Sequence, residues 1–445
     1  MFKKGLLTGV LLFGLFFGAG NLIFPPNIGV LSGDYFIYAI SGFIVSAVGL
    51  ATFTLIVSLF TGKGYQELMS DLIHPKFALV YLVALYLTIG PLFAIPRTAT
   101  TSFSIGIEPV LANEYKGIGL SVFAIIYFAF TYWLAVSPTK LLDRIGKVLT
   151  PLFAGMIVLI IILGLQQLPH LPMNVASIDY SGAGKAFGSG VLEGYNTLDA
   201  LAAVAFSVVA MDTLKTFEFK TQKDYKRTIL FAGVSVASLF SVLYVGLALL
   251  GNYFKLPDTF KGNVGTYILS EMTQRVFGPS AQVFLAVMVI VTCLTTTVGL
   301  VVSISKFFNT IYTKFTYITY VRLFCLLGFI ISNFGLDTII SLAVPVLLVL
   351  YPITIVIALL VCLHQLVTLS KVGIRLTMGI VTILSFLQVL STINGFHYFK
   401  TVISLIPYHD IGVPWLLPAV VGVALAIILP YQKITKFKNN AEEKK

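Results

Sequence analysis

Apolar stretches long enough to cross a lipid bilayer recur along almost the whole chain, separated by short polar segments. A transmembrane helix needs roughly 20 apolar residues, and about twelve stretches approach that length. The pattern predicts an all-α integral membrane protein with about 12 transmembrane helices, because a helix satisfies its own backbone inside lipid. The predicted spans cover residues 7–30, 37–60, 77–96, 117–136, 148–167, 190–213, 228–251, 280–304, 317–333, 338–363, 374–393 and 411–430.

The first stretch is interrupted at residues 18–25, which read Gly-Ala-Gly-Asn-Leu-Ile-Phe-Pro. Glycine weakens a helix, Asn21 brings an amide to membrane depth, and Pro25 and Pro26 remove two backbone donors. Unwound backbone is tolerated in a bilayer only where protein or a water-filled cavity satisfies it. One interpretation is a kinked helix that packs closely through its glycines. The cluster of Gly, Asn and Pro favours another, in which two half-helices present free N–H and C=O groups to a solute.

The distribution of basic residues along the chain predicts how the protein is oriented in the membrane. The chain has 445 residues, of which 58% are hydrophobic and 11% charged, and its formal net charge is +11. Soluble domains carry roughly 25% charged residues. The basic residues occupy alternate loops, so the positive-inside rule places both termini in the cytoplasm, and the charge is not a sign of nucleic-acid binding.

Two other simple interpretations of the sequence are disfavoured. A cleaved signal peptide ending near Gly18–Gly20 would discard the most specialised segment of the chain. The three cysteines, Cys293, Cys325 and Cys362, fall within predicted spans without metal-ligand spacing, which predicts buried thiols and no metal centre or cofactor.

Spans one to five and six to ten occupy stretches of similar length. Because five is odd, the second set would cross the membrane in the opposite sense, which predicts an inverted repeat with discontinuous first and sixth helices. The sixth span supports this only in part, since it holds Asp199 but no central Gly or Pro. The predicted organisation is a first repeat at 1–167, an external loop at 168–189, a second repeat at 190–363, two peripheral helices at 364–432 and a cytoplasmic tail at 433–445.

A second polar stretch, residues 252–279, lies on the outside in this topology. A short helix is predicted near Val264–Arg275, because Lys261-Gly262 and Gly278-Pro279 flank it. With the loop at 168–189 it could form a lid.

Three consecutive threonines, Thr295, Thr296 and Thr297, lie in the eighth span. A single threonine in a membrane helix commonly bonds back to its own preceding turn. Three in a row also offer hydroxyl oxygens, which are suitable ligands for a hard cation such as sodium.

Ionisable side chains inside a membrane are functional candidates by default. Asp199 lies deep in the sixth span and is a candidate site or gating residue, whereas Glu193 and Arg97 lie near predicted span ends, where interfacial solvation or a structural ion pair explains them equally well. The sequence lacks the HExxH, GxSxG and P-loop motifs, so we expect no enzyme activity.

The sequence resembles the branched-chain amino acid:cation symporter family of bacterial inner membranes. The resemblance covers the whole chain and is carried by Phe17–Pro26, by Gly90–Ala99 and by Tyr195–Ala203. It implies a multi-pass protein of the bacterial plasma membrane that imports leucine, isoleucine and valine with sodium or protons.

More distantly, the first span is similar to the GxGNxxxFP element of transporters with the LeuT-type inverted repeat. That similarity implies that the amides of Ala19 and Gly20, within the stretch Gly18–Asn21, hold the substrate carboxylate. It also implies a cation shell formed by the carbonyls of Gly14, Phe17 and Thr292 and the hydroxyls of Thr295 and Thr296.

The sixth span departs from this pattern, because Ser207 replaces a glycine and Leu201 and Ala203 replace hydroxyl-bearing residues of a second sodium site. One coupling ion is therefore predicted. The fifth span has no basic residue that could take the place of sodium, which favours sodium over a proton, although Asp199 keeps a proton route open.

The sequence thus predicts a secondary active transporter that works by alternating access. The substrate ammonium is expected on carbonyls of a sixth-span break near Ala203, and its branched side chain against Phe206 and apolar residues of spans three and eight. An apolar pocket distinguishes one methylene by only about 1–3 kcal/mol, so the three substrates should share it. The alternatives are a broader amino-acid or nucleobase permease of the same fold and, from another class, a channel, for which the sequence offers no ring of acids or filter repeat.

Overall fold

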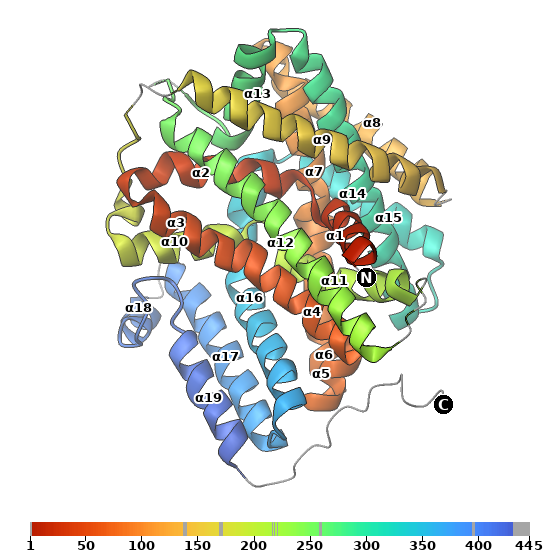
Figure 1. Cartoon of the computed structure of the whole chain (residues 1–445), viewed down its shortest axis with the longest axis vertical. Coiled ribbons are helices and arrows are strands. Elements are labelled where there is room, and N and C mark those ends of the chain that lie inside the picture. Colours follow the sequence, from red (N-terminus) through yellow and green to blue (C-terminus); the bar gives the residue numbers. More distant parts are fainter. Residues whose placement is uncertain are drawn as a thin grey trace.

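The fold is a bundle of membrane-length helices (Figure 1). The computed structural model describes residues 2–136, 140–168, 172–215, 217, 219, 221–257, 260–393 and 397–429, and these contain helices and no β-strand. The all-α prediction is confirmed for this part of the chain. The predicted tail at 433–445, and residues 169–171 of the predicted external loop, lie outside the described residues.

Each of the twelve predicted spans coincides with a helix or with a run of consecutive helices. The first part of the chain contains the following helices in order: α1 (Phe2–Phe16), α2 (Ala19–Ser32), η1 (Gly33–Tyr35), α3 (Phe36–Phe43), the π-helical turn η2 (Ile44–Gly49), α4 (Leu50–Thr61), α5 (Tyr65–Leu72), α6 (Pro75–Leu87), the π-helical turn η3 (Thr88–Leu92), α7 (Ala94–Gly106), the short turns η4 (Glu108–Val110) and η5 (Asn113–Tyr115), α8 (Lys116–Val136) and α9 (Lys140–Gln167).

The second half of the chain begins with η6 (Ile178–Tyr180) and a helix pair that replaces the predicted sixth span. This half comprises α10 (Ala183–Tyr195) and α11 (Asp199–Lys215), α12 (Gln222–Tyr253), α13 (Val264–Phe277), α14 (Ala281–Ile311), α15 (Tyr317–Ser332), α16 (Leu336–Leu366), α17 (Lys371–Thr392), α18 (His397–Ser404) and α19 (Leu416–Ile428). Helix α13 confirms the short helix predicted between the seventh and eighth spans, with Asn263 as its N-cap.

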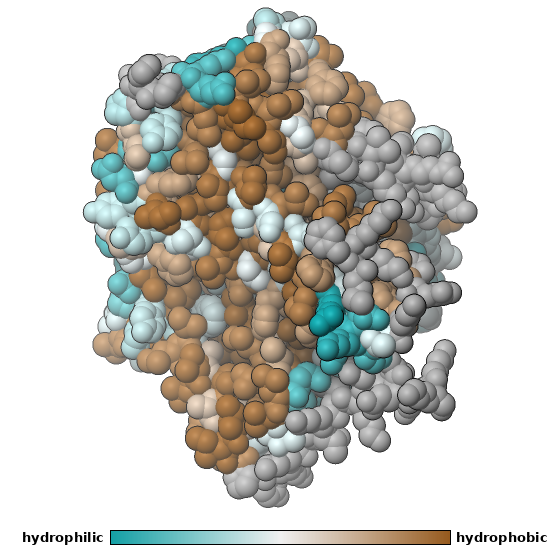
Figure 2. Space-filling model, viewed as in Figure 1, coloured by the Kyte–Doolittle hydropathy of each residue, from teal (hydrophilic) through white to brown (hydrophobic). Residues whose placement is uncertain are grey.

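Among the described residues, seven helical segments are long and apolar enough to cross a membrane, and the bent pair α10–α11 makes an eighth if it is one span. Shorter apolar helices include parts of α1, α9, α15 and α19. Apolar side chains cover most of the face shown in Figure 2, and polar ones gather toward its margins. The protein is therefore a membrane protein, and the number of helices that cross the bilayer stays a prediction.

Glycines bring two pairs of helices into backbone contact. A Cβ atom added at Gly29 of α2 would lie 1.9 Å from the carbonyl oxygen of Ala248 in α12, and one added at Gly251 of α12 would lie 2.1 Å from a carbonyl oxygen of α2. Gly42 of α3 and Gly190 of α10 meet the facing backbone in the same reciprocal way. Small residues permit this close approach, which is a common way to pack membrane helices.

Helices α1, α11 and α12 lie toward the middle of the molecule, whereas α17 and α19 lie to one side next to α16, and α18 packs against α17 (Figure 1). Helix α14 packs against α7, and α11 packs against α4. Helix α2 also contacts α7, and α1 contacts α14.

Candidate functional site

The first helix pair is broken at Phe17 and Gly18. Helix α1 ends at Phe16 and α2 begins at Ala19, with Gly18 in an extended conformation (φ −146°, ψ −165°). The N–H of Gly18 donates to Asn21 Oδ1 at 2.7 Å. The predicted discontinuity is confirmed, but residues 18–25 are not unwound throughout, because α2 continues through Pro25 and Pro26. Its first amides, at Ala19 and Gly20, have no partner within the helix.

The sixth span is also broken, at Asn196–Leu198. Helices α10 and α11 meet at an angle of 42°. Leu198 turns the chain with φ 68°, a left-handed conformation that is uncommon for a side chain without a short polar group. The expectation of a break near Ala203 is wrong, since Ala203 lies inside helix α11. Its carbonyl belongs to the regular helix and not to an unwound segment.

Arg97 fills the second break. The predicted end of the third span near residue 96 is wrong, because α7 continues to Gly106 and Arg97 is buried at 6% exposure. Its Nη1 donates to the carbonyl of Asn196 at 2.5 Å and its Nη2 to that of Thr197 at 3.2 Å. Arg97 therefore satisfies carbonyls that the end of α10 leaves without helical partners.

Glu193 is half-buried near the end of α10 and accepts hydrogen bonds from Asn27 Nδ2 at 2.9 Å and Asn196 Nδ2 at 3.2 Å. These partners are neutral amides, and no ion pair to Glu193 occurs among the residues that the structure describes. Of the two interpretations for this residue, the structural ion pair is not observed.

Asp199 begins α11 and is buried at 5% exposure. Its carboxylate accepts hydrogen bonds from Asn21 Nδ2 at 3.2 and 3.1 Å and from the hydroxyl of Tyr244 at 2.8 Å. Asn21 Nδ2 also lies within hydrogen-bonding distance of the Tyr244 hydroxyl. Sequence reasoning missed Tyr244 of α12, although a tyrosine in the middle of an apolar span needs a polar partner and could have signalled this cluster.

A pocket lies between the two breaks and helices α7 and α14. Polar groups line one part of the pocket and apolar side chains the rest. Its lining residues are Phe16, Gly18, Ala19, Gly20, Asn21, Ile89, Ala94, Arg97, Thr98, Thr197, Leu198, Asp199, Ala202, Phe206, Thr296 and Leu300.

The structure thus brings together eight of the predicted site residues on one pocket. They are Gly18, Ala19, Gly20, Asn21, Phe206, Thr296, Asp199 and Arg97. Phe206 meets Phe16 edge to face at 5.6 Å between ring centroids. Ala203, although on the same helix as Phe206, is not among the residues that line the pocket.

The predicted cation ligands form a second group at the edge of the pocket. The Thr296 hydroxyl lies 3.3 Å from the carbonyl oxygen of Phe17 and 3.2 Å from that of Thr292. The Thr295 hydroxyl donates to the same Thr292 oxygen at 2.8 Å. Gly14 lies in the last turn of α1, where carbonyls have no helical partner. Hydrogen-bonding contacts therefore link four of the five predicted residues in series: Phe17, Thr296, Thr292 and Thr295.

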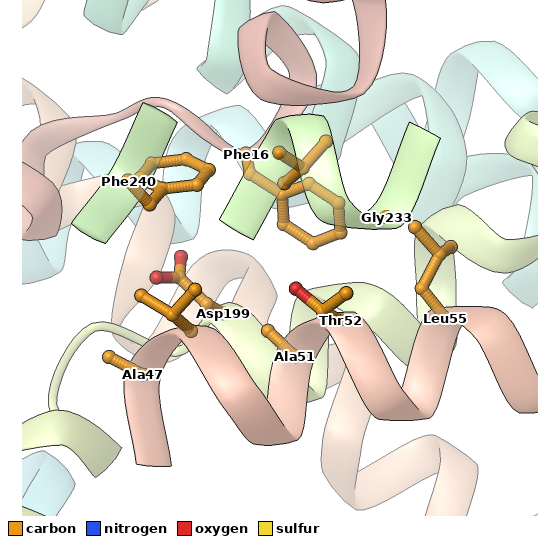
Figure 3. A pocket seen from close by; sticks show the side chains of 10 residues that line it. Phe16, Ala47, Ala51, Thr52, Leu55, Asp199, Gly233 and Phe240 are labelled. Atoms are coloured by element: carbon orange, nitrogen blue, oxygen red, sulfur yellow. The ribbon is translucent and has the colours of Figure 1, made fainter. Parts of the chain in front are cut away.

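A second, apolar pocket lies between α1, α4 and α12 (Figure 3). Ala51 and Leu55 line it from α4, and Phe240 lines it from α12. Phe16 and Asp199 line both pockets. The Phe16 ring and the Asp199 carboxylate therefore lie at the boundary between them.

Comparison with protein families gives a match over residues 1–433 to the family described as branched-chain amino acid transport protein. A protein of Staphylococcus haemolyticus named as a branched-chain amino acid carrier is 37% identical, over 99% of this chain and 98% of its own. A similarly named protein of Staphylococcus aureus is 36% identical over 96% of this chain and 97% of its own.

Solved transporter structures share the fold. A nucleobase-cation-symport-1 family transporter aligns with a TM-score of 0.58 and 14% identity over 95% of this chain and 91% of its own. A manganese transporter of Eremococcus coleocola gives a TM-score of 0.59 at 12% identity, over 95% of this chain and 94% of its own. A Na⁺-coupled sialic acid symporter gives 0.57 at 16% identity, over 97% of this chain and 91% of its own. At these identities the likeness shows the fold alone.

Proposed function

Because the chain belongs to the family of branched-chain amino acid transport proteins, we propose that it imports leucine, isoleucine and valine by symport with a cation, sodium in preference to a proton. The observation that carries this proposal is the pocket between two broken helices. In transporters, such breaks present helix ends to a substrate and its coupling ion. Transport would proceed by alternating access within a 5+5 inverted repeat of the LeuT type, with both termini in the cytoplasm.

The substrate carboxylate would bind the Ala19 and Gly20 amides, where the N-terminus of α2 carries partial positive charge. Its branched side chain would lie against Ile89, Phe206 and Leu300, which form part of the apolar lining. These side chains contribute hydrophobic area without a group that distinguishes one aliphatic chain from another. Leucine, isoleucine and valine would therefore compete for the same pocket.

The cation would bind between α1 and α14. Three neutral oxygens converge there, from the Phe17 and Thr292 carbonyls and the Thr296 hydroxyl. The hydroxyl now donates to those carbonyls, and on sodium binding it would rotate so that its lone pair faces the ion. Carbonyl and hydroxyl oxygens suit a hard cation, and the C-terminal end of α1 supplies partial negative charge.

Purified protein in proteoliposomes tests the coupling. We expect labelled leucine to accumulate against its gradient when an inward sodium gradient is imposed at equal pH on both sides. A proton gradient in sodium-free buffer should support little uptake. Full uptake without sodium would overturn the choice of ion, accumulation of uracil in place of leucine would favour a nucleobase permease, and equilibration without accumulation would indicate a channel.

Thr296→Ala tests the cation ligands. Removing one oxygen from the shell should raise the sodium concentration for half-maximal leucine uptake about tenfold. Thr310→Ala, on the same helix, is the matched control, because the Thr310 hydroxyl is exposed and bonds to Phe307 one turn away. Unchanged sodium dependence in Thr296→Ala would remove this hydroxyl from the cation site.

A further inference from the structure

Two buried side chains of opposite charge, Arg97 and Asp199, line the pocket. In the part of the chain that the structure describes, no ion pair within 4 Å joins them or links either to another charged group. A buried charge without a countercharge is costly. The pocket therefore carries one positive and one negative group, and neither is in direct contact with a countercharge among the described residues.

The positive group lies beside the N-terminus of α2. A Cβ atom added at Gly20 would be 2.7 Å from Arg97 Nη2, so the guanidinium lies directly against the first turn of α2. Arg97 Cζ also lies 5.3 Å from the ring centroid of Phe24. Nε is buried and has no hydrogen-bond partner among the described residues. The guanidinium and the α2 amides together form an environment that favours an anion.

The negative group is held by neutral donors. Asp199 accepts from the amide of Asn21 and from the hydroxyl of Tyr244, which orient its carboxylate without neutralising it. With the nearby Thr197 hydroxyl, three side chains donate to a carboxylate that can accept about four hydrogen bonds. The carboxylate therefore retains capacity for a further donor from the pocket.

The carbonyls at the second break are already occupied. Arg97 donates to those of Asn196 and Thr197, and the carbonyl of Leu198 accepts from Ala202 inside α11. An ammonium group that entered the pocket would have to share the first two with a guanidinium, whose positive charge repels it. Asp199 is the acidic side chain among the residues that line the pocket.

We propose that the pocket binds its substrate as a zwitterion suspended between these two side chains: Arg97, with the Ala19 and Gly20 amides, holds the carboxylate, and Asp199 holds the ammonium. The inference rests on the proposed function and specifies its substrate class as α-amino acids with both groups free. Each substrate charge supplies the missing countercharge of one side chain. Substrate binding thus gives the buried side chains of Arg97 and Asp199 each a countercharge.

Two leucine analogues separate the two ends of the site. Leucinol keeps the ammonium and lacks the carboxylate, and 4-methyl-2-oxopentanoate keeps the carboxylate and lacks the ammonium. Binding to the purified full-length protein is measured by displacement of labelled leucine and, for variants that bind leucine weakly, by direct calorimetric titration. We expect wild-type protein to bind leucine far more tightly than either analogue.

Asp199→Asn should weaken leucine binding about 100-fold and leave the oxo acid bound at least as tightly as in wild type. Arg97→Gln should weaken leucine and the oxo acid and spare leucinol. Asp199→Glu keeps the charge and should restore the preference for leucine over the oxo acid. Glu193→Gln is the matched control, a half-buried acid on the same broken helix that does not line the pocket.

Equal weakening of leucine and the oxo acid in Asp199→Asn, with a loss of sodium dependence, would assign Asp199 to the cation and overturn the proposal. Unaltered leucine binding in either charge variant would also overturn it. If wild-type protein binds no branched-chain amino acid, the proposed function itself fails. Failure of the proposed function is therefore seen in the wild-type protein, whereas failure of the roles proposed for Arg97 and Asp199 is seen only in the variants.

Discussion

Gly20→Ala is expected to weaken leucine binding by about 10- to 100-fold while the protein still folds. The added methyl group would lie 2.7 Å from Nη2 and 3.2 Å from Cζ of Arg97, and 3.2 Å from the carbonyl oxygen of Thr197. The guanidinium is the end of a flexible side chain and can move away at little cost in stability. It would then leave the carboxylate site, where a charge-assisted hydrogen bond contributes about 1.5–3 kcal/mol.

Equilibrium binding of labelled leucine checks this expectation, with thermal unfolding in detergent as the test of folding. Gly299→Ala is the control, because a Cβ atom at Gly299 of α14 would meet no atom within 4 Å. Wild-type affinity in Gly20→Ala would show that the Arg97 guanidinium can shift without affecting the substrate.

Gly29→Ala is expected to destabilise the protein by about 3 kcal/mol, near the upper end of typical overpacking. Here the obstacle is backbone, because the new Cβ atom would lie 1.9 Å from the carbonyl oxygen of Ala248 and 2.9 Å from the amide nitrogen of Asn252. Neither group can rotate away, so α2 and α12 must separate. The unfolding temperature in detergent micelles should fall clearly.

The control for Gly29→Ala is Gly379→Ala in α17, where the added Cβ atom meets nothing within 4 Å. In a helix interior that substitution should be neutral or stabilising by about 0.5–1 kcal/mol. Equal unfolding temperatures for the two variants would contradict the close packing of α2 on α12.

The first break could be predicted from sequence because glycine, asparagine and proline are concentrated at one point of an apolar span. Its extent could not, since α2 accommodates Pro25 and Pro26 and only two residues leave the helix. The predicted position of the second break is wrong for a different reason. Leucine normally avoids the left-handed conformation that Leu198 adopts, so no local residue type marks the turn. Tertiary contacts, above all those of Arg97, hold it.

The position of Arg97 shows how a proline can mislead. Gly90, Pro91 and Pro96 suggest that the third span ends nearby. Gly90 does depart from helical geometry (φ −101°, ψ −130°), but α7 starts again at Ala94. Pro96 falls in the first turn of α7, where an amide has no helical acceptor and proline costs little. The arginine is therefore carried into the interior instead of to a membrane surface.

The reciprocal glycine contacts have a consequence for the transport cycle. Helices joined backbone to backbone cannot slide past each other without losing that fit, so we expect α2 to travel with α12 and α3 to travel with α10. The opposite wall of the pocket meets its neighbours through exchangeable side chains, such as the hydroxyls of Thr98 and Thr297, which join α7 to α14. We therefore expect the helix group that contains α2 and α12 to move relative to the group that contains α7 and α14, along the surface where Thr296 of α14 touches Phe17. A cation bound at this surface would hold the two groups together.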